Sequence, residues 1–224
     1  MTVPSRFIEV SHPIEPGMGT YPGLPAPRAE AVLDYDASRP RYQDRAEFFI
    51  ASLYLCGNTG TYVDAPVHRF RGGADLAHLP LESLADLPAV RVNGRGGRGI
   101  GPEAFAGLEL RGCAVLVNTG WSRHWRTPRY FEPAPFLTAA ACDALVAAGA
   151  RFVGIDSLNV DDTLDPSRPA HTKLLGAGVP VCEHMTNLAA VPATGGRLHA
   201  APIAWVGGAS FPVRAYVIAP VRAG

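Results

Sequence analysis

Glycine and proline constrain the fold of this chain more than any other residue types. The 224 residues include 24 glycines and 21 prolines, which are dispersed along the chain instead of forming one block. Because proline interrupts helices and both residues mark turns, the sequence predicts many short elements joined by tight turns. Residues 13–28, where proline recurs every few positions, are expected to form an irregular loop.

The remaining patterns predict a mixed α/β domain with more strand than helix. The clearest helix is expected from Thr138 to Ala148, with Thr138 as its N-cap and Gly149 as its stop. Shorter helices are expected at 102–106 and near 170–177. The predicted strands are short apolar runs bounded by turn residues, at 7–11, 48–55, 89–92, 114–120, 152–156 and 214–220. The strand, helix and strand from 114 to 156 predict a right-handed crossover between parallel strands.

Composition and charge exclude several classes of protein. The length fits a single domain over residues 1–224, and the apolar content of 47% is enough for a core. Twenty acidic and twenty basic residues are interspersed, so no nucleic-acid partner is expected. No apolar run is long enough for a membrane span and no secretory signal is recognisable, so we expect a cytoplasmic protein. The four cysteines form no C-x-x-C pair and indicate neither a zinc knuckle nor a disulfide framework.

The most informative stretch is Asn-Thr-Gly-Thr-Tyr-Val-Asp-Ala-Pro-Val-His at residues 58–68. It follows a predicted strand, and its glycine and proline favour a tight, structured loop. Pro66 places a bend between Asp64 and His68, so the two side chains can converge. A carboxylate and an imidazole held together can serve as a metal ligand and a proton shuttle, although in isolation they also fit a turn cap and a surface residue.

A second stretch, residues 171–188, contains His171 and Glu183. Glu183 follows the apolar run Val-Pro-Val-Cys, which places it at or near a strand end, where polar groups often converge on ligands. Considered alone, Glu183 equally fits a solvated loop carboxylate. His184 is adjacent, and because neighbouring strand residues point to opposite faces, it is not expected to share the role of Glu183.

Together the two stretches resemble the kynurenine formamidase or cyclase family of metal-dependent hydrolases. That family carries H-x-G-T-H-x-D-A-P-x-H early in the chain and, later, a histidine twelve residues before a glutamate. The residues that match are Gly60, Thr61, Asp64, Ala65, Pro66, His68, His171 and Glu183. Segments 119–122, 154–157 and 212–215 also look like family landmarks, and 21–23 resembles its aromatic-Pro-Gly loop near the substrate.

The resemblance implies a fold and a quaternary structure. It implies a swivelling β/β/α-type single domain with a central, β-barrel-like, mostly antiparallel sheet and few helices. It also implies a homodimer or homotetramer. The segments 13–28 and 121–136 look suited to reaching over the pocket of a neighbouring copy.

Two departures from the family motif concern its metal ligands. Asn58 and Tyr62 stand where the family has histidines. In the family, those histidines and the aspartate hold one ion, and the aspartate, the late histidine and the glutamate hold a second. Asparagine and a phenol are poor zinc ligands, so the resemblance implies at most one divalent ion, Zn or Mn, or none. The ligands expected for that ion are Asp64, His171 and Glu183. Kynurenine formamidase activity itself is not expected.

Three functions remain open from the sequence. The first is hydrolysis of an amide, formamide, lactam or lactone bond of a small molecule. The second is metal-independent cyclisation, dehydration or isomerisation in a specialised-metabolite pathway, with Tyr62 donating to an oxyanion. The third is small-molecule binding without catalysis. For either enzyme the expected catalytic residues are His68, Asp64, Glu183 and Tyr62, and the expected substrate-binding residues are Tyr21, Asn58, Trp121 and His124.

Overall fold

The computed structural model describes residues 4–19, 21–94 and 97–221, so both ends of the domain expected over 1–224 lie outside these ranges. Nine strands form one curled sheet in the order β1-β13-β11-β5-β7-β9-β10-β4-β12. Within the described ranges the α-helices are α1 (Tyr35–Ser38), α2 (Ala139–Ala147) and α3 (Pro169–Gly176). The strands of the sheet are β1 (Ser5–Glu9), β4 (Tyr62–Asp64), β5 (Leu87–Asn93), β7 (Ala114–Asn118), β9 (Phe152–Ile155), β10 (Val181–Glu183), β11 (Gly196–His199), β12 (Ser210–Pro212) and β13 (Tyr216–Pro220).

The expected fold class is confirmed. Most neighbouring pairs in the sheet are antiparallel, and the central run β5-β7-β9-β10 is parallel. The predicted crossover from β7 through α2 to β9 is present. Thr138 caps α2 by accepting from the backbone N–H of Ala141, and Gly149 follows the helix with a positive φ of 76°. The alanine-rich run and its caps therefore specify this helix locally.

The sheet separates two apolar clusters. On β7, Val115 and Val117 face the helices α2 and α3, and Leu116 faces the other cluster, enclosed by the curl of the sheet. This alternation follows from the two-residue period of a strand. Both faces of β7 and β9 are buried, which explains why these strands are nearly continuous apolar runs. No helix in the described part of the chain has the length and apolar character needed to cross a bilayer.

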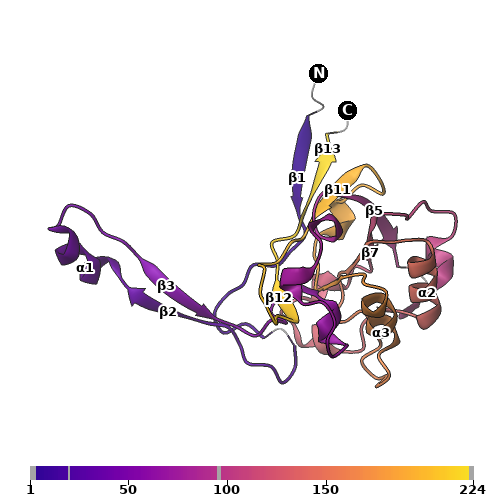
Figure 1. Cartoon of the computed structure of the whole chain (residues 1–224), viewed down its shortest axis with the longest axis horizontal. Coiled ribbons are helices and arrows are strands. Elements are labelled where there is room, and N and C mark those ends of the chain that lie inside the picture. Colours follow the sequence, from indigo (N-terminus) through magenta and orange to yellow (C-terminus); the bar gives the residue numbers. More distant parts are fainter. Residues whose placement is uncertain (1–3, 20, 95–96, 222–224) are drawn as a thin grey trace.

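A hairpin arm projects from this body (Figure 1). It consists of β2 (Arg28–Leu33), α1 and β3 (Ile50–Tyr54), and among the described residues these two strands pair with each other and with no other strand. The strand predicted at 48–55 is therefore real but does not belong to the central sheet. Small two-residue strands, β6 (Gly99–Ile100) and β8 (Phe136–Leu137), form a third, separate pairing beside the body.

Candidate active site

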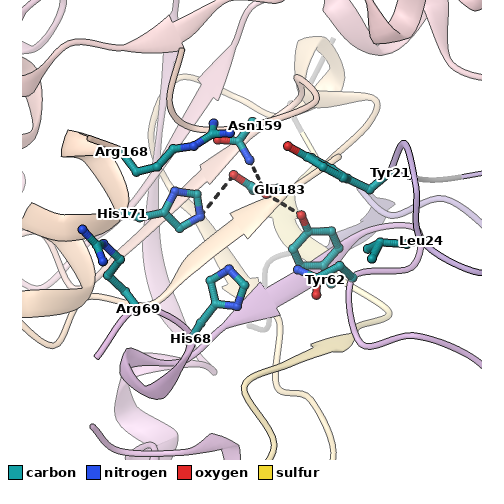
Figure 2. Close-up of a pocket in the computed structure, with 10 residues that line it drawn as sticks. Tyr21, Leu24, Tyr62, His68, Arg69, Asn159, Arg168, His171 and Glu183 are labelled. Carbon is teal, nitrogen blue, oxygen red and sulfur yellow. Dashed lines mark hydrogen bonds and ion pairs between the residues drawn. The ribbon is translucent and has the colours of Figure 1, made fainter. Parts of the chain in front are cut away.

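A cavity of about 330 Å³ opens where β4, β10 and the start of α3 meet. Figure 2 shows its polar side chains converging from these elements and from the loop after β9. The volume is at the lower end of the range for small-molecule sites. The cavity is lined by Tyr21, Leu24, Asn58, Tyr62, His68, Arg69, Asn159, Arg168, His171 and Glu183.

The register of β4 against β10 places Tyr62 directly opposite Glu183. The Tyr62 hydroxyl donates a 2.5 Å hydrogen bond to Oε2 of Glu183, and both side chains are almost fully buried. Asp64 lies two residues along β4, so it occupies the same face of the strand as Tyr62. The stretch that was expected to be a loop thus contains a short strand, and its pairing with β10 aligns the two motifs.

Glu183 is held from three directions. Its Oε1 accepts from the backbone N–H of Val160 at 2.6 Å, and the Asn159 amide lies 3.4 Å from Oε2, beside the Tyr62 hydroxyl. Burial raises the pKa of Glu183 to about 7, where the attraction of His171 opposes the repulsion of Asp64. Burial, together with the nearby carboxylates, raises the pKa of Tyr62 well above its usual value. Tyr62 therefore remains a protonated donor.

His171 lies on α3 and is oriented by Asp161. Its Nδ1 is 2.6 Å from Oδ2 of Asp161, which also accepts from the backbone N–H of His171. Its Nε2 consequently faces Oδ2 of Asp64 at 3.7 Å and Oε1 of Glu183 at 3.6 Å. Burial lowers the pKa of His171, but the hydrogen bond to Asp161 and the attraction of the Asp64 and Glu183 carboxylates outweigh it and raise this pKa to about 10.

His68 stands at the mouth of the cavity, with 33% of its side chain exposed. Its Nδ1 lies 3.7 Å from Oδ1 of Asp64 and 3.1 Å from the hydroxyl of Ser210. Ser210 on β12 also donates to Oδ1 of Asp64. His68 is therefore the ring closest to solvent in a group whose other members are buried.

Three of these residues form a possible metal site. Ligand atoms of Asp64, His68 and His171 lie within 4.8 Å of one another. Oδ2 of Asp64 is buried without a hydrogen-bond partner among the described residues, as expected of an atom that could face a cation. A carboxylate oxygen with two imidazoles suits zinc or manganese, and the Asp161–His171 contact is the outer-shell arrangement that orients histidine ligands. The residues present thus fit one ion.

The composition of this group differs in one position from the expected ligand set. It contains His68 where Glu183 was expected; Glu183 lies beside the group, with Oε1 3.6 Å from Nε2 of His171, and its role as a ligand stays a prediction. Asn58 and Tyr62, where the family motif has histidines, both line the cavity.

Two expected substrate-binding residues lie outside the cavity lining. Trp121 donates from its indole nitrogen to the carbonyl of Tyr130 at 3.1 Å, and the His124 ring stands edge-on to it. Tyr21, which does line the cavity, packs against the same small apolar cluster as Trp121. His184, which was not expected to share the role of Glu183, is buried. Its ring contacts the Tyr62 ring, and its Nδ1 forms a hydrogen bond with the Tyr130 hydroxyl.

Sequence reasoning missed several residues of the site. Asn159 and Asp161 follow the end of strand β9, and the argument that singled out Glu183 at a strand end could have found them. Arg168 carried a weaker signal, because it precedes Pro169, the first residue of α3. The other missed residues are Leu24, Arg69 and Ser210.

Comparison with known proteins agrees with this geometry. The model of the family described as "Putative cyclase" matches residues 8–162. A kynurenine formamidase from Salinibacter ruber is 30% identical over 212 residues, which cover 93% of this chain and 95% of that protein. The relative therefore aligns with this chain through both motifs.

Solved structures support the same assignment. Isatin hydrolase A from Labrenzia aggregata, bound to benzyl benzoate, superposes with a TM-score of 0.83 over 97% of this chain and 94% of that one; at 23% identity it supports the fold alone. A potential metal-dependent hydrolase with cyclase activity superposes with a TM-score of 0.76 at 26% identity and covers 98% of this chain and 100% of its own. The shared fold, the aligned motifs and the matching family model together show that this chain belongs to the putative cyclase family, alongside the kynurenine formamidases.

Proposed function

We propose that this protein is a hydrolase that opens an amide, formamide, lactam or lactone bond of a small molecule. The observation that carries the proposal is the buried Tyr62–Glu183 hydrogen bond in the wall of a cavity that His171 and His68 also line. Such a cavity brings a hydrogen-bond donor, a carboxylate and imidazoles to one point. The relatives support the reaction class, since they include a kynurenine formamidase and a potential metal-dependent hydrolase.

The geometry gives Tyr62 and Glu183 complementary roles. Once Glu183 has taken up a proton, it can donate to the Tyr62 oxygen, and the single phenol proton of Tyr62 would then be free to stabilise the oxyanion that forms when water adds to the substrate carbonyl. Glu183, whose pKa of about 7 is suited to proton transfer, would accept a proton from that water. As the carbon–nitrogen or carbon–oxygen bond breaks, the same proton would pass to the leaving atom. His68 at the cavity mouth would exchange protons with solvent.

Asp64, His68 and His171 are the residues that would hold a divalent ion. When bound, such an ion supplies Lewis-acid polarisation of the carbonyl and a more acidic water. With an ion bound, His68 would be a ligand, and Glu183, whose oxygens accept from Tyr62 and Val160, would remain the residue that moves the proton.

A metal-independent cyclisation, dehydration or isomerisation in a specialised-metabolite pathway is the second candidate. The short Tyr62–Glu183 contact favours it, because a phenol donor coupled to a carboxylate of raised pKa is an acid–base pair that needs no metal. In this reaction Glu183 would remove a proton next to a carbonyl while Tyr62 stabilises the enolate oxygen.

Metal analysis combined with activity assays tests the hydrolase proposal and its dependence on a metal ion. The purified protein would be assayed for bound zinc and manganese, then tested on aryl formamides, lactams including isatin, and lactones, before and after chelation. Hydrolysis that chelation abolishes and added metal restores supports the metal-dependent hydrolase. Hydrolysis that survives chelation assigns the chemistry to Tyr62 and Glu183 alone. If no bond of these classes is hydrolysed in either state, the hydrolase proposal fails.

We also propose that the chain forms a homodimer or homotetramer through the hairpin arm. Large apolar side chains on the arm are exposed to an extent unusual for a monomer: Val32, Phe48, Phe49, Ile50 and Leu53 are each between 48% and 65% exposed. A two-stranded hairpin is also marginally stable alone in water. Light scattering of the protein and of a Phe49→Asp, Ile50→Asp variant tests this. A monomeric parent protein at micromolar concentration would contradict it.

A cytoplasmic setting is proposed with it. All four cysteines are free thiols, which is usual for proteins kept in a reducing compartment.

A further inference from the structure

A cationic group lines the cavity on the side opposite the Tyr21 wall. Arg168 lies at the N-cap of α3, and Figure 2 shows its guanidinium reaching past His171 toward Asn159. Arg69 lines the same cavity from the loop after η2 (Pro66–His68) and is held by a 3.0 Å hydrogen bond to Thr172. Neither arginine belongs to the catalytic arrangement described above.

One nitrogen of Arg168 is left without a protein partner. Its Nη1 is buried and has no hydrogen-bond acceptor within the part of the chain that the structure describes. A buried guanidinium donor without an acceptor is costly, because its water has been removed and nothing replaces it. Glu183 and Asp161 accept hydrogen bonds from other donors. The unmatched donor inside a ligand-sized cavity therefore calls for an acceptor on the ligand.

The backbone holds Arg168 in this position at some cost. Its φ is 49°, in the left-handed region that residues with a side chain rarely adopt. The carbonyl of Arg168 accepts from both the backbone N–H and the hydroxyl of Thr172, which fixes the residue at the start of α3. Strain of this kind persists where the surrounding structure enforces it, and it clusters at ligand sites.

The opposite wall of the cavity has a different character. Tyr21 and Leu24 present an aromatic ring and an aliphatic side chain, and Tyr62 adds a second ring. A ligand that fills the space between the walls needs a flat apolar part against the rings and an anionic end against the guanidinium groups. Arginine binds planar carboxylates through two parallel hydrogen bonds, which matches such an end.

We propose that the substrate of this enzyme is a small aromatic or otherwise flat molecule with a carboxylate, and that Arg168, assisted by Arg69, binds the carboxylate and determines specificity. The inference rests on the proposed function for the position of the reacting bond, beside Tyr62 and Glu183. It adds the chemical class of the substrate and the residues that select it. Arg168 is a binding residue in this scheme and takes no part in bond cleavage.

Benzoate and its neutral isostere benzamide are suitable probes, because they differ in charge and hardly in shape. Calorimetric titration of the wild-type protein should give a benzoate Kd on the order of 1 mM, as expected for a ligand of this size. Benzamide should bind at least about tenfold more weakly, since it cannot accept two hydrogen bonds as an anion does. Equal affinity for the two probes, or no saturable binding of benzoate by about 10 mM, would overturn the proposal.

Variants then assign the binding to Arg168. In Arg168→Gln the benzoate Kd should rise at least about tenfold, whereas Arg168→Lys, which keeps the charge but cannot form two parallel hydrogen bonds, should recover only part of the affinity. Arg6→Gln is a matched control, because Arg6 is an exposed arginine on β1 that bonds the carbonyl of Ala190. Unchanged benzoate binding in Arg168→Gln, with a melting temperature equal to that of the wild type, would refute the role of Arg168.

The outcome is separable from that of the proposed function. If benzoate binding depends on Arg168 and no amide or lactone bond is hydrolysed, the carboxylate site stands and the hydrolase proposal fails. If hydrolysis is found but carboxylated and neutral substrates have equal kcat/KM in both the wild type and Arg168→Gln, the carboxylate site fails and the hydrolase proposal stands.

Discussion

Replacing Asp161 by asparagine tests how the site is held together. The Asp161 carboxylate is buried and accepts from three donors: the backbone N–H groups of Ala170 and His171, and Nδ1 of His171. Asparagine has one acceptor oxygen, and its amide group would face a donor on the other side. In Asp161→Asn, either the start of α3 or the His171 ring must therefore lose its partner.

The size of the effect follows from these contacts. Loss of a helix-capping hydrogen bond costs about 1 kcal/mol, and loss of a charge-assisted bond to the His171 ring costs roughly 2 kcal/mol. The free energy of unfolding should therefore fall by about 1–2 kcal/mol in Asp161→Asn, depending on which partner is lost, and this lowers the melting temperature by about 2–8 °C for a chain of this length. Removal of the group that orients a metal-binding histidine should also weaken zinc uptake by about 10–100-fold.

Urea unfolding followed by far-UV circular dichroism measures the first effect, and zinc titration measures the second. Asp162→Asn is the matched control, because the neighbouring Asp162 is partly exposed and bonds Arg98 and the backbone of Leu164 instead of His171. The control should lose less than about 1 kcal/mol. If Asp161→Asn were as stable as Asp162→Asn and bound zinc equally well, the assignment of Asp161 as the residue that orients His171 would be wrong.

Three further predictions concern the cavity and the sheet. Tyr62→Phe removes the donor to Glu183 and should lower kcat by about 10²-fold with little change in KM; an unchanged kcat would rule out Tyr62 as the oxyanion donor. Asn58→His combined with Tyr62→His should raise the zinc or manganese content measured by mass spectrometry, whereas two tightly held ions in the parent protein would contradict the interpretation of these substitutions. Gly154→Ala should lower the free energy of unfolding, measured by chemical denaturation, by about 1–3 kcal/mol, because a Cβ there would collide with the sulfur of Met185. Gly19→Ala is the control, because a Cβ at Gly19 meets no neighbouring atom. Equal stability of the two variants would contradict this prediction and show that the sheet adjusts around residue 154.

Local signals in the sequence predicted the elements that depend on local contacts. The helix from Ala139 to Ala147 has its own cap and stop, and the runs at β7 and β9 are apolar because both faces of these strands are buried. The position of Glu183 at the end of β10 followed from the same reasoning. These features needed no knowledge of what packs against them.

Features that depend on distant segments were harder to predict. The apolar run at 48–55 is alike in composition to a core strand, and hydrophobicity alone does not distinguish a buried strand from an exposed arm. Asp161 belongs to an acidic stretch, Asp161-Asp162-Thr163-Leu164-Asp165, whose composition is typical of a surface loop. Asp161 can orient His171 only because the fold places the start of α3, which carries His171, next to the Asp161 carboxylate. Trp121 and His124 were expected to bind the substrate, but they are not among the residues that line the cavity; their rings contact each other.

The hairpin arm is connected to the cavity at both of its ends. Leu24 lies four residues before β2 begins at Arg28, and Asn58 lies four residues after β3 ends at Tyr54. The two segments that connect the arm to the rest of the chain therefore both line the cavity. A rotation of the arm relative to the sheet would move Leu24 and Asn58 relative to His171 and Glu183 and so change the width of the cavity. A partner that binds the arm in solution would in this way change the width of the cavity opening through which substrates enter.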